Sequence, residues 1–255
     1  MIRLLFSLII WVYYGGMFIL MFPFVLLAYI ITAPFDKYKR VPNWIFLMGG
    51  KLYVSTIPTW NVHYHGIDNY EKTEGTIIIS NHQSFMDMPT QSLLPWTFKW
   101  VSKKSLFFVP FMGWTMKLSG HISIDRNKKT AIKALNNIIP LLDHKIPIIL
   151  FPEGTRSLDG KLHKFKNGAF SIATKHNYKI QPIVMDGTRN LLPSGDWKFS
   201  FHQDIDISIL KPIDPQNFDS ISDLKKHAYK VMKNELKRLR GETQKTETAD
   251  IASIN

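Results

Sequence analysis

Residues 76–87 read Thr-Ile-Ile-Ile-Ser-Asn-His-Gln-Ser-Phe-Met-Asp. A short β-branched apolar run of this kind is typical of a strand that is buried on both faces of a sheet. The same change from apolar to polar residues recurs at residues 120–126, Gly-His-Ile-Ser-Ile-Asp-Arg, and at residues 149–157, Ile-Leu-Phe-Pro-Glu-Gly-Thr-Arg-Ser. Sites in open α/β sheets form in the loops at the carboxyl ends of strands. We therefore expect these three segments to meet in one site.

Outward from these segments, strand-like and helix-like runs alternate along the chain, and this alternation predicts an α/β fold with a mixed, largely parallel central sheet flanked by helices. The domain is expected over residues 61–240, and the polar tail at residues 241–255 is predicted to be disordered. Further strand-like runs lie at Phe98–Ser102, Ile180–Met185 and Asp206–Leu210, and the expected helices lie at Ser105–Leu118, Lys129–Leu142, Gly168–His176 and Asp223–Arg240.

The first 60 residues are expected to form a membrane-anchoring helical segment. No residue from Leu4 to Phe35 is charged, and about 20 apolar residues suffice to span a bilayer. Gly15-Gly16 and Pro23 interrupt the run, so one spanning helix and two shorter re-entrant helices are both open. A signal peptide and a buried soluble helix are weaker alternatives. The stretch Trp44–Trp60 is expected to be an interfacial or packing helix.

Composition limits the chemistry. The chain has 255 residues and no cysteine, which excludes disulfides, thiolate nucleophiles and cysteine-based metal sites. Its net charge of +12 suits an anionic partner, and nucleic acid, anionic lipid headgroups and phosphorylated cofactors all qualify. Basic residues at Lys37, Lys39 and Arg40 follow the apolar run, and such a flank favours the cytoplasmic side of a membrane.

His82 and Asp87 could form a base and the group that orients it. A carboxylate that accepts a hydrogen bond from one imidazole nitrogen leaves the other nitrogen as a proton acceptor. If a helix begins near His82, Asp87 lies little more than one turn further on. A capping or surface pair is the alternative on these residues alone. Backbone N–H groups near Asn81–Gln83 are candidates for steadying an oxyanion.

The loop after residue 151 could bind an anion. Gly154 would let the backbone approach a ligand closely, and Arg156 offers a planar fork that matches phosphate oxygens. An ordinary β-turn with a Glu153–Arg156 surface pair is the alternative. Asp125-Arg126 and Lys103-Lys104 could add charge to the same site, or be a solvated strand end and the start of an amphipathic helix.

In combination these motifs resemble the glycerolipid acyltransferase family, and within it the bacterial 1-acyl-sn-glycerol-3-phosphate acyltransferase branch. The resemblance covers roughly residues 60–215. It rests on Asn-His-Gln-x-x-x-Asp at residues 81–87, Lys-Lys-Ser-Leu-x-x-x-Pro-Phe-x-Gly at 103–113, Ile-Asp-Arg at 124–126 and Phe-Pro-Glu-Gly-Thr-Arg-Ser at 151–157. Phe165-Lys166-x-Gly168-Ala169 and Pro182-Ile183-Val184 add to it.

The resemblance implies roles for single residues. His82 would be the general base, and Asp87 would orient it. The residues implied in binding the acyl acceptor and its phosphate are Arg126, Glu153, Gly154, Thr155, Arg156, Lys104 and Lys166. The implied reaction moves a fatty acyl chain from acyl-CoA or acyl carrier protein to the sn-2 hydroxyl of 1-acyl-sn-glycerol-3-phosphate (lysophosphatidic acid), giving phosphatidic acid. A thioester is already activated, so no metal or cofactor is expected.

Other functions stay open on the sequence. Glycerol 3-phosphate or a lysophospholipid could replace lysophosphatidic acid as acceptor. A serine lipase would use Ser84, although the Gly-x-Ser-x-Gly pattern is absent. A non-enzymatic lipid or nucleic-acid binder would use the basic helix Asp223–Arg240. No nucleic acid is expected as a partner, and His63 and His65 are not expected to bind a metal. The expected location is the bacterial inner membrane, with the site on its cytoplasmic face.

Overall fold

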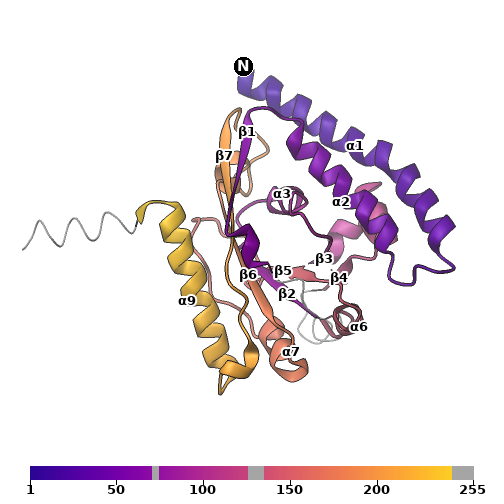
Figure 1. The fold of residues 1–255 in the computed structure, drawn as a ribbon. Coiled ribbons are helices and arrows are strands. Elements are labelled where there is room, and N and C mark those ends of the chain that lie inside the picture. The colour runs from indigo at the N-terminus through magenta and orange to yellow at the C-terminus, as the bar shows by residue number, and fades with distance from the viewer. Residues whose placement is uncertain (71–74, 126–134, 243–255) are drawn as a thin grey trace, which may run out of the picture.

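The computed structural model describes residues 1–70, 75–125 and 135–242. Its centre is a seven-stranded sheet in the order β1-β7-β6-β2-β5-β3-β4 (Figure 1). The strands are β1 Trp60–His65, β2 Ile77–Ser80, β3 Lys99–Lys103, β4 Ile122–Ile124, β5 Ile148–Leu150, β6 Ile180–Asp186 and β7 Gln203–Ile209. Neighbouring strands are parallel except β6 and β7. The predicted mixed, largely parallel sheet is therefore confirmed.

Helices cover both faces of the sheet. The helices are α1 Ile2–Thr32, α2 Arg40–Ser55, α3 Asp87–Gln91, α4 Met112–Leu118, α6 Ile139–Asp143, α7 Gly168–His176, α8 Thr188–Leu191 and α9 Ile221–Leu239, with 3-10 turns at η1 Ile67–Asn69, η2 Lys104–Phe108 and η3 Pro215–Asn217. Helices α1 and α2 lie on one side of the sheet, and α7 and α9 lie on the other (Figure 1).

The apolar run of β2 explains why both faces need cover. Ile77 and Ile79 pack in the core formed with α7 and α9, whereas Ile78 packs in the core formed with α1, α2 and α4. All three side chains are fully buried. Successive side chains of a strand point to opposite faces, so a continuous apolar run serves two helical layers at once.

Helix α1 is continuous over 31 residues, through both Gly15-Gly16 and Pro23. The alternative of two shorter helices is therefore wrong. By length and composition α1 could cross a membrane, and only 17% of its most apolar window is buried, which argues against a soluble core helix. Large apolar side chains remain exposed along its outer face, including those of Leu8, Val12, Ile19 and Leu27.

The structure corrects several expected boundaries. Pro110 and extended backbone at Val109 divide the helix expected at Ser105–Leu118 into η2 and α4, because proline disfavours helical backbone in the residue before it. Strand β1 was missed as a member of the sheet. Helix α2 confirms a packing helix near Trp44–Trp60 but begins and ends earlier. Residues 126–134, with Arg126 and the start of the helix expected at Lys129–Leu142, and residues 243–255 of the tail lie outside the described residues.

Candidate active site

The loops that follow β2 and β5 meet at the carboxyl edge of the sheet, where these two strands are parallel neighbours. The backbone N–H of His82 donates to Glu153 Oε1 at 2.9 Å, and the N–H of Ser157 donates to the carbonyl oxygen of His82 at 2.7 Å. The predicted convergence of His82 with the Glu153–Arg156 turn is confirmed. The helix considered near His82 begins at Asp87, so His82 lies in the loop between β2 and α3.

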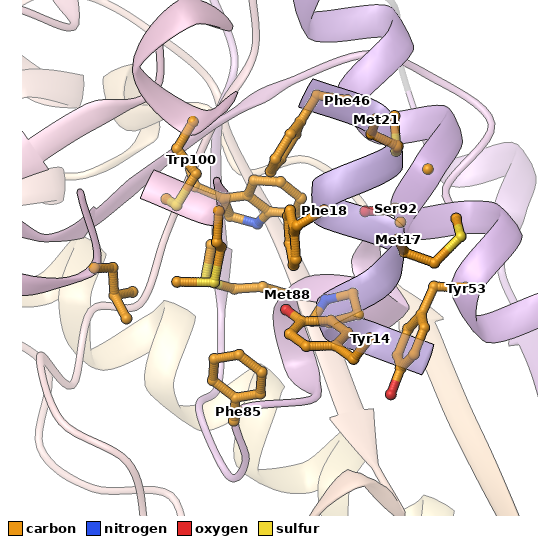
Figure 2. Close-up of a pocket in the computed structure, with 16 residues that line it drawn as sticks. Tyr14, Met17, Phe18, Met21, Phe46, Tyr53, Phe85, Met88, Ser92 and Trp100 are labelled. Atoms are coloured by element: carbon orange, nitrogen blue, oxygen red, sulfur yellow. The ribbon is translucent and has the colours of Figure 1, made fainter. Parts of the chain in front are cut away.

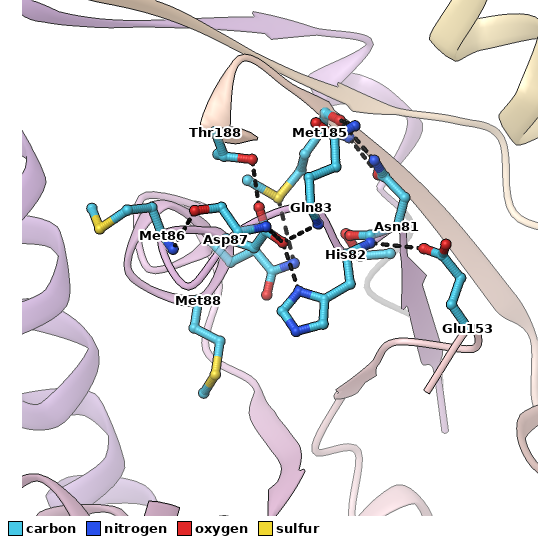
Figure 3. Close-up of polar contacts among 12 residues, drawn as sticks. Asn81, His82, Gln83, Met86, Asp87, Met88, Glu153, Met185 and Thr188 are labelled. Atoms are coloured by element: carbon cyan, nitrogen blue, oxygen red, sulfur yellow. Dashed lines mark hydrogen bonds and ion pairs between the residues drawn. The ribbon is translucent and has the colours of Figure 1, made fainter. Parts of the chain in front are cut away.

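Asp87 holds the His82 ring from a fully buried position. Its Oδ2 accepts hydrogen bonds from His82 Nδ1 at 2.7 Å, from the Gln83 N–H at 2.7 Å and from the Ser84 N–H at 2.9 Å (Figure 3). Because a carboxylate only accepts, Nδ1 is the ring nitrogen that carries hydrogen. Nε2 of the neutral imidazole is then free to accept a proton.

Further contacts fix the loop between β2 and α3. The His82 ring stacks on Phe151, with centroids 4.0 Å apart and the planes inclined by 14°. Asn81 exchanges two hydrogen bonds with the backbone of Met185 at the end of β6, and Gln83 Nε2 donates to the same carbonyl oxygen. Residues on both sides of His82 are thus bound to the neighbouring strand.

Two of the backbone N–H groups considered near Asn81–Gln83 as candidates for steadying an oxyanion already donate within the protein. The N–H of His82 donates to Glu153, and the N–H of Gln83 donates to Asp87. Each amide has one hydrogen, and here that hydrogen already holds the loop in shape.

Glu153 connects two loops. Its Oε1 accepts from the His82 N–H and its Oε2 accepts from the His163 N–H at 2.8 Å. Burial raises the pKa of this carboxyl, while the two backbone hydrogen bonds oppose the rise. Both oxygens of Glu153 therefore bind backbone N–H groups and stabilise the loop that carries His82. Glu153 is not among the described residues that line the cleft next to His82.

A cleft of about 990 Å³ opens beside His82, and we call it the polar cleft. Lys103, Arg156 and Lys166 line it, and in the described part of the chain Arg156 has neither a hydrogen bond nor an ion pair. Gly154, which also lines it, has a φ of +74°, and a Cβ there would lie 2.6 Å from Lys166 Nζ. Lys104 and Thr155 are exposed but are not among the described lining residues.

An apolar pocket adjoins the polar cleft, and the two share Phe85, Met88 and Leu106. Figure 2 shows its aromatic and methionine side chains. The lining residues come from α1, α2, the β2–α3 loop, α3, β3, η2 and α4. They are Tyr14, Met17, Phe18, Met21, Phe46, Gly49, Gly50, Tyr53, Phe85, Met88, Pro89, Ser92, Trp100, Leu106, Met112 and Met116. The membrane-type helix α1 is therefore one wall of the site.

Two alternative sites lack support. The Ser84 hydroxyl is fully buried and donates to the carbonyl oxygen of Leu192 at 2.7 Å, so it does not face the cleft as a lipase nucleophile would. His63 and His65 lie beside Asp204 and Asp206 on the neighbouring strand. The described residues contain no group of three or more His, Cys, Asp or Glu side chains that could hold a metal ion.

Comparison with known proteins places this geometry in a family. Residues 61–186 match the family model described as Acyltransferase. The 1-acyl-sn-glycerol-3-phosphate acyltransferase of Escherichia coli is 35% identical over 188 residues, which cover 70% of this chain and 74% of that protein. The chain belongs to the glycerolipid acyltransferase family.

Other members of the acyltransferase family extend the comparison. A 1-acyl-sn-glycerol-3-phosphate acyltransferase of Chlamydomonas reinhardtii is 36% identical over 78% of this chain, but the chain spans only 60% of that relative's length. The crystal structure of the 1-acyl-sn-glycerophosphate acyltransferase PlsC of Thermotoga maritima matches with a TM-score of 0.76 and 28% identity, over 93% of this chain and 96% of that one.

One residue of this acyltransferase site has no counterpart in the sequence motifs. Thr188, which begins α8 just after β6, donates to Asp87 Oδ1 at 2.5 Å. The pattern that singled out His82, a polar residue after a buried strand, also describes Thr188. Arg126 lies outside the described residues, although Ile124, two positions earlier, lines the polar cleft.

Proposed function

We propose that this chain transfers a fatty acyl group from a thioester to the sn-2 hydroxyl of 1-acyl-sn-glycerol-3-phosphate. One observation carries the proposal: His82, oriented by buried Asp87, lies in the same cleft as the guanidinium of Arg156, which has no partner among the described residues. A base beside a phosphate-binding cation fits an acceptor that carries both a hydroxyl and a phosphate. The names of the relatives support the same reaction.

The chemistry follows from the oriented imidazole. His82 Nε2 takes the hydroxyl proton as the lipid oxygen attacks the thioester carbonyl carbon. The new C–O bond forms, the C–S bond breaks, and the thiolate leaves and takes a proton from the imidazolium. Asp87 stabilises the positive imidazolium while it exists. The donor is acyl-CoA or acyl carrier protein, and the reaction needs no metal or cofactor because the thioester is already activated.

Positive side chains position the acceptor. Arg156 and Lys166 neutralise the phosphate monoester, with Lys103 at the same cleft, and so hold the hydroxyl against His82. An acyl chain extends into the adjoining apolar pocket, where burial of each methylene contributes about 0.8 kcal/mol. Arg126 is proposed to contribute to the phosphate site on the resemblance alone.

We also propose that α1 holds the chain in the bacterial inner membrane, with the polar cleft on the cytoplasmic face. Contacts with the rest of the chain extend along the helix, from Arg3, bonded to Phe199, to Phe22, packed on Phe111 and Trp114. A helix bound to the domain over that length fits a position along one leaflet, with its exposed apolar face toward lipid. Lys37, Lys39 and Arg40 follow it, and a basic flank favours the cytoplasmic side.

The test is acyl transfer by the purified full chain in mixed micelles. Lysophosphatidic acid, glycerol 3-phosphate and lysophosphatidylcholine are each offered with acyl-CoA and with acyl carrier protein. Phosphatidic acid should form from lysophosphatidic acid. His82→Ala should lower turnover by about 10² to 10⁴-fold, whereas His63→Ala, an exposed histidine outside the cleft, should not. Release of free fatty acid without transfer, or full turnover in His82→Ala, would contradict the proposal.

A further inference from the structure

The carboxylate of Asp87 accepts one hydrogen bond from outside the loop between β2 and α3. Three of its four hydrogen bonds come from His82, Gln83 and Ser84. The fourth comes from the Thr188 hydroxyl to Oδ1 (Figure 3). Both Thr188 and Asp87 have side chains that are fully buried from solvent. The Thr188 hydroxyl therefore connects the carboxylate to the segment that follows β6.

This fourth bond decides how the carboxylate can turn. The other three donors all bind Oδ2, and they come from the loop that directly precedes Asp87. The terminal torsion of aspartate is broad, so bonds to one oxygen leave the plane of the group weakly defined. In the described part of the chain, Thr188 is the one hydrogen-bond donor to Oδ1. The Thr188 hydroxyl fixes the plane of the carboxylate. It also gives the buried Oδ1 a hydrogen-bond donor, without which that oxygen would be unsatisfied.

The backbone that presents Thr188 is specialised. Gly187 precedes it with a φ of +89°, and a Cβ at that position would lie 2.2 Å from the Asp204 carbonyl oxygen. Only glycine fits a turn that is both left-handed and this close to β7. The turn brings α8 close to α3, because the last residues of β6 are already bound to Asn81 and Gln83 through Met185.

We propose that Thr188 is a third, positioning member of the His82–Asp87 pair. It acts through Asp87: by fixing the carboxylate it fixes the direction of His82 Nε2 in the polar cleft. Thr188 touches no substrate in this account, so its loss should lower turnover and leave acceptor binding unchanged. The inference rests on the proposed function, since it needs His82 to be the base.

The experiment compares Thr188→Val, Thr188→Ser and a matched control. Valine keeps the shape and removes the donor, while serine keeps the donor. Thr90→Val is the control: this buried threonine lies in α3 beside Asp87, and its hydroxyl has no hydrogen-bond partner in the described residues. Thr188→Val should lower kcat about tenfold to a hundredfold with KM for lysophosphatidic acid nearly unchanged. Thr188→Ser should recover most of kcat, and Thr90→Val should match wild type.

A double-mutant cycle separates positioning from mere folding. If Thr188 acts through His82, Thr188→Val should cost nothing further in a His82→Ala background. Wild-type kcat in Thr188→Val, no rescue by serine, or an equal additional loss in the His82→Ala background would overturn the inference. Thr188→Ala takes the place of valine if that variant does not fold. A wild-type chain inactive on every acceptor would instead refute the proposed function itself.

Discussion

At the scale of single residues, the proposed function assigns phosphate binding and proton transfer to different side chains. Arg156 lines the polar cleft and has no partner in the described part of the chain. Arg156→Ala should raise KM for lysophosphatidic acid about tenfold or more, because ground and transition states both carry the phosphate. Arg156→Lys should recover part of this loss, since an ammonium lacks the fork. Steady-state kinetics in micelles measure both constants. An equal effect from Lys175→Ala, an exposed lysine of α7 outside the described lining, would contradict a specific role.

A second residue-scale prediction concerns buried Lys99. Burial, with the nearby charge of Lys39, lowers its pKa from 10.5 to about 7. Between these pH values the unfolded chain holds the proton and the folded chain does not, so folding stability should rise with pH across this window by up to about 1.4 kcal/mol per pH unit. Lys99→Met should lack this contribution. At low pH the variant should be more stable than the wild type, and this difference in stability should shrink as pH rises. Thermal unfolding in detergent at pH 6 to 9 measures it, and a constant difference would refute a lowered pKa at Lys99.

At the same scale, the pairing of His82 with Asp87 was predictable because the two lie five positions apart in the sequence. The contact of Thr188 with Asp87, and the contacts of Glu153 with two backbone N–H groups, were not predictable in this way. Thr188 reaches Asp87 across 101 positions of sequence, and Glu153 uses both oxygens on backbone N–H groups. Backbone donors carry no side-chain signature, so a motif shows that Glu153 matters without showing what it contacts.

At the scale of secondary-structure elements, the sequence predicted the buried strands well and the interrupted elements poorly. The β2 run is continuously apolar because both faces are covered. Strand β1 lies at the edge of the sheet, and His63 and His65 are partly exposed there, so its pattern is weak. Helix α3 spans only Asp87–Gln91 and contains Pro89, so it has too few residues for a helical period to show.

Helix packing provides the element-scale prediction. Gly50 of α2 faces α3 so closely that a Cβ would lie 2.4 Å from Ser92 Oγ and 2.8 Å from its Cβ. Gly50→Ala should therefore lower the melting temperature. The matched control is Gly15→Ala in α1, where nothing lies within 4 Å of the added Cβ. Alanine in an open helical position should stabilise by about 0.5–1 kcal/mol. Thermal unfolding of both variants checks this, and equal shifts would contradict close packing at Gly50.

At the scale of the whole molecule, the exposed apolar face of α1 is expected to hold the chain at a membrane. Val12, Ile19 and Leu27 are 75%, 55% and 56% exposed. Replacing all three with glutamate should move most of the protein from the membrane fraction to the supernatant, since each carboxylate would have to leave water. Leu158→Glu is the control, because this leucine is 68% exposed and lies at the polar cleft, outside α1. Membrane flotation measures the distribution, and unchanged flotation of the triple variant would refute the anchor.

Helix α1 also provides part of the lining of the apolar pocket. Tyr14, Met17, Phe18 and Met21 of this helix form part of the pocket, and a Cβ at Gly49 of α2 would overlap the present position of the Met21 side chain. The catalytic domain is therefore not a separable module. A shortened chain that begins after Thr32 would lack the long apolar helix and, with it, one wall of the pocket. The aromatic surface exposed in this way would favour aggregation. Efforts to obtain a water-soluble enzyme should redesign the outer surface of α1 and keep its inner one.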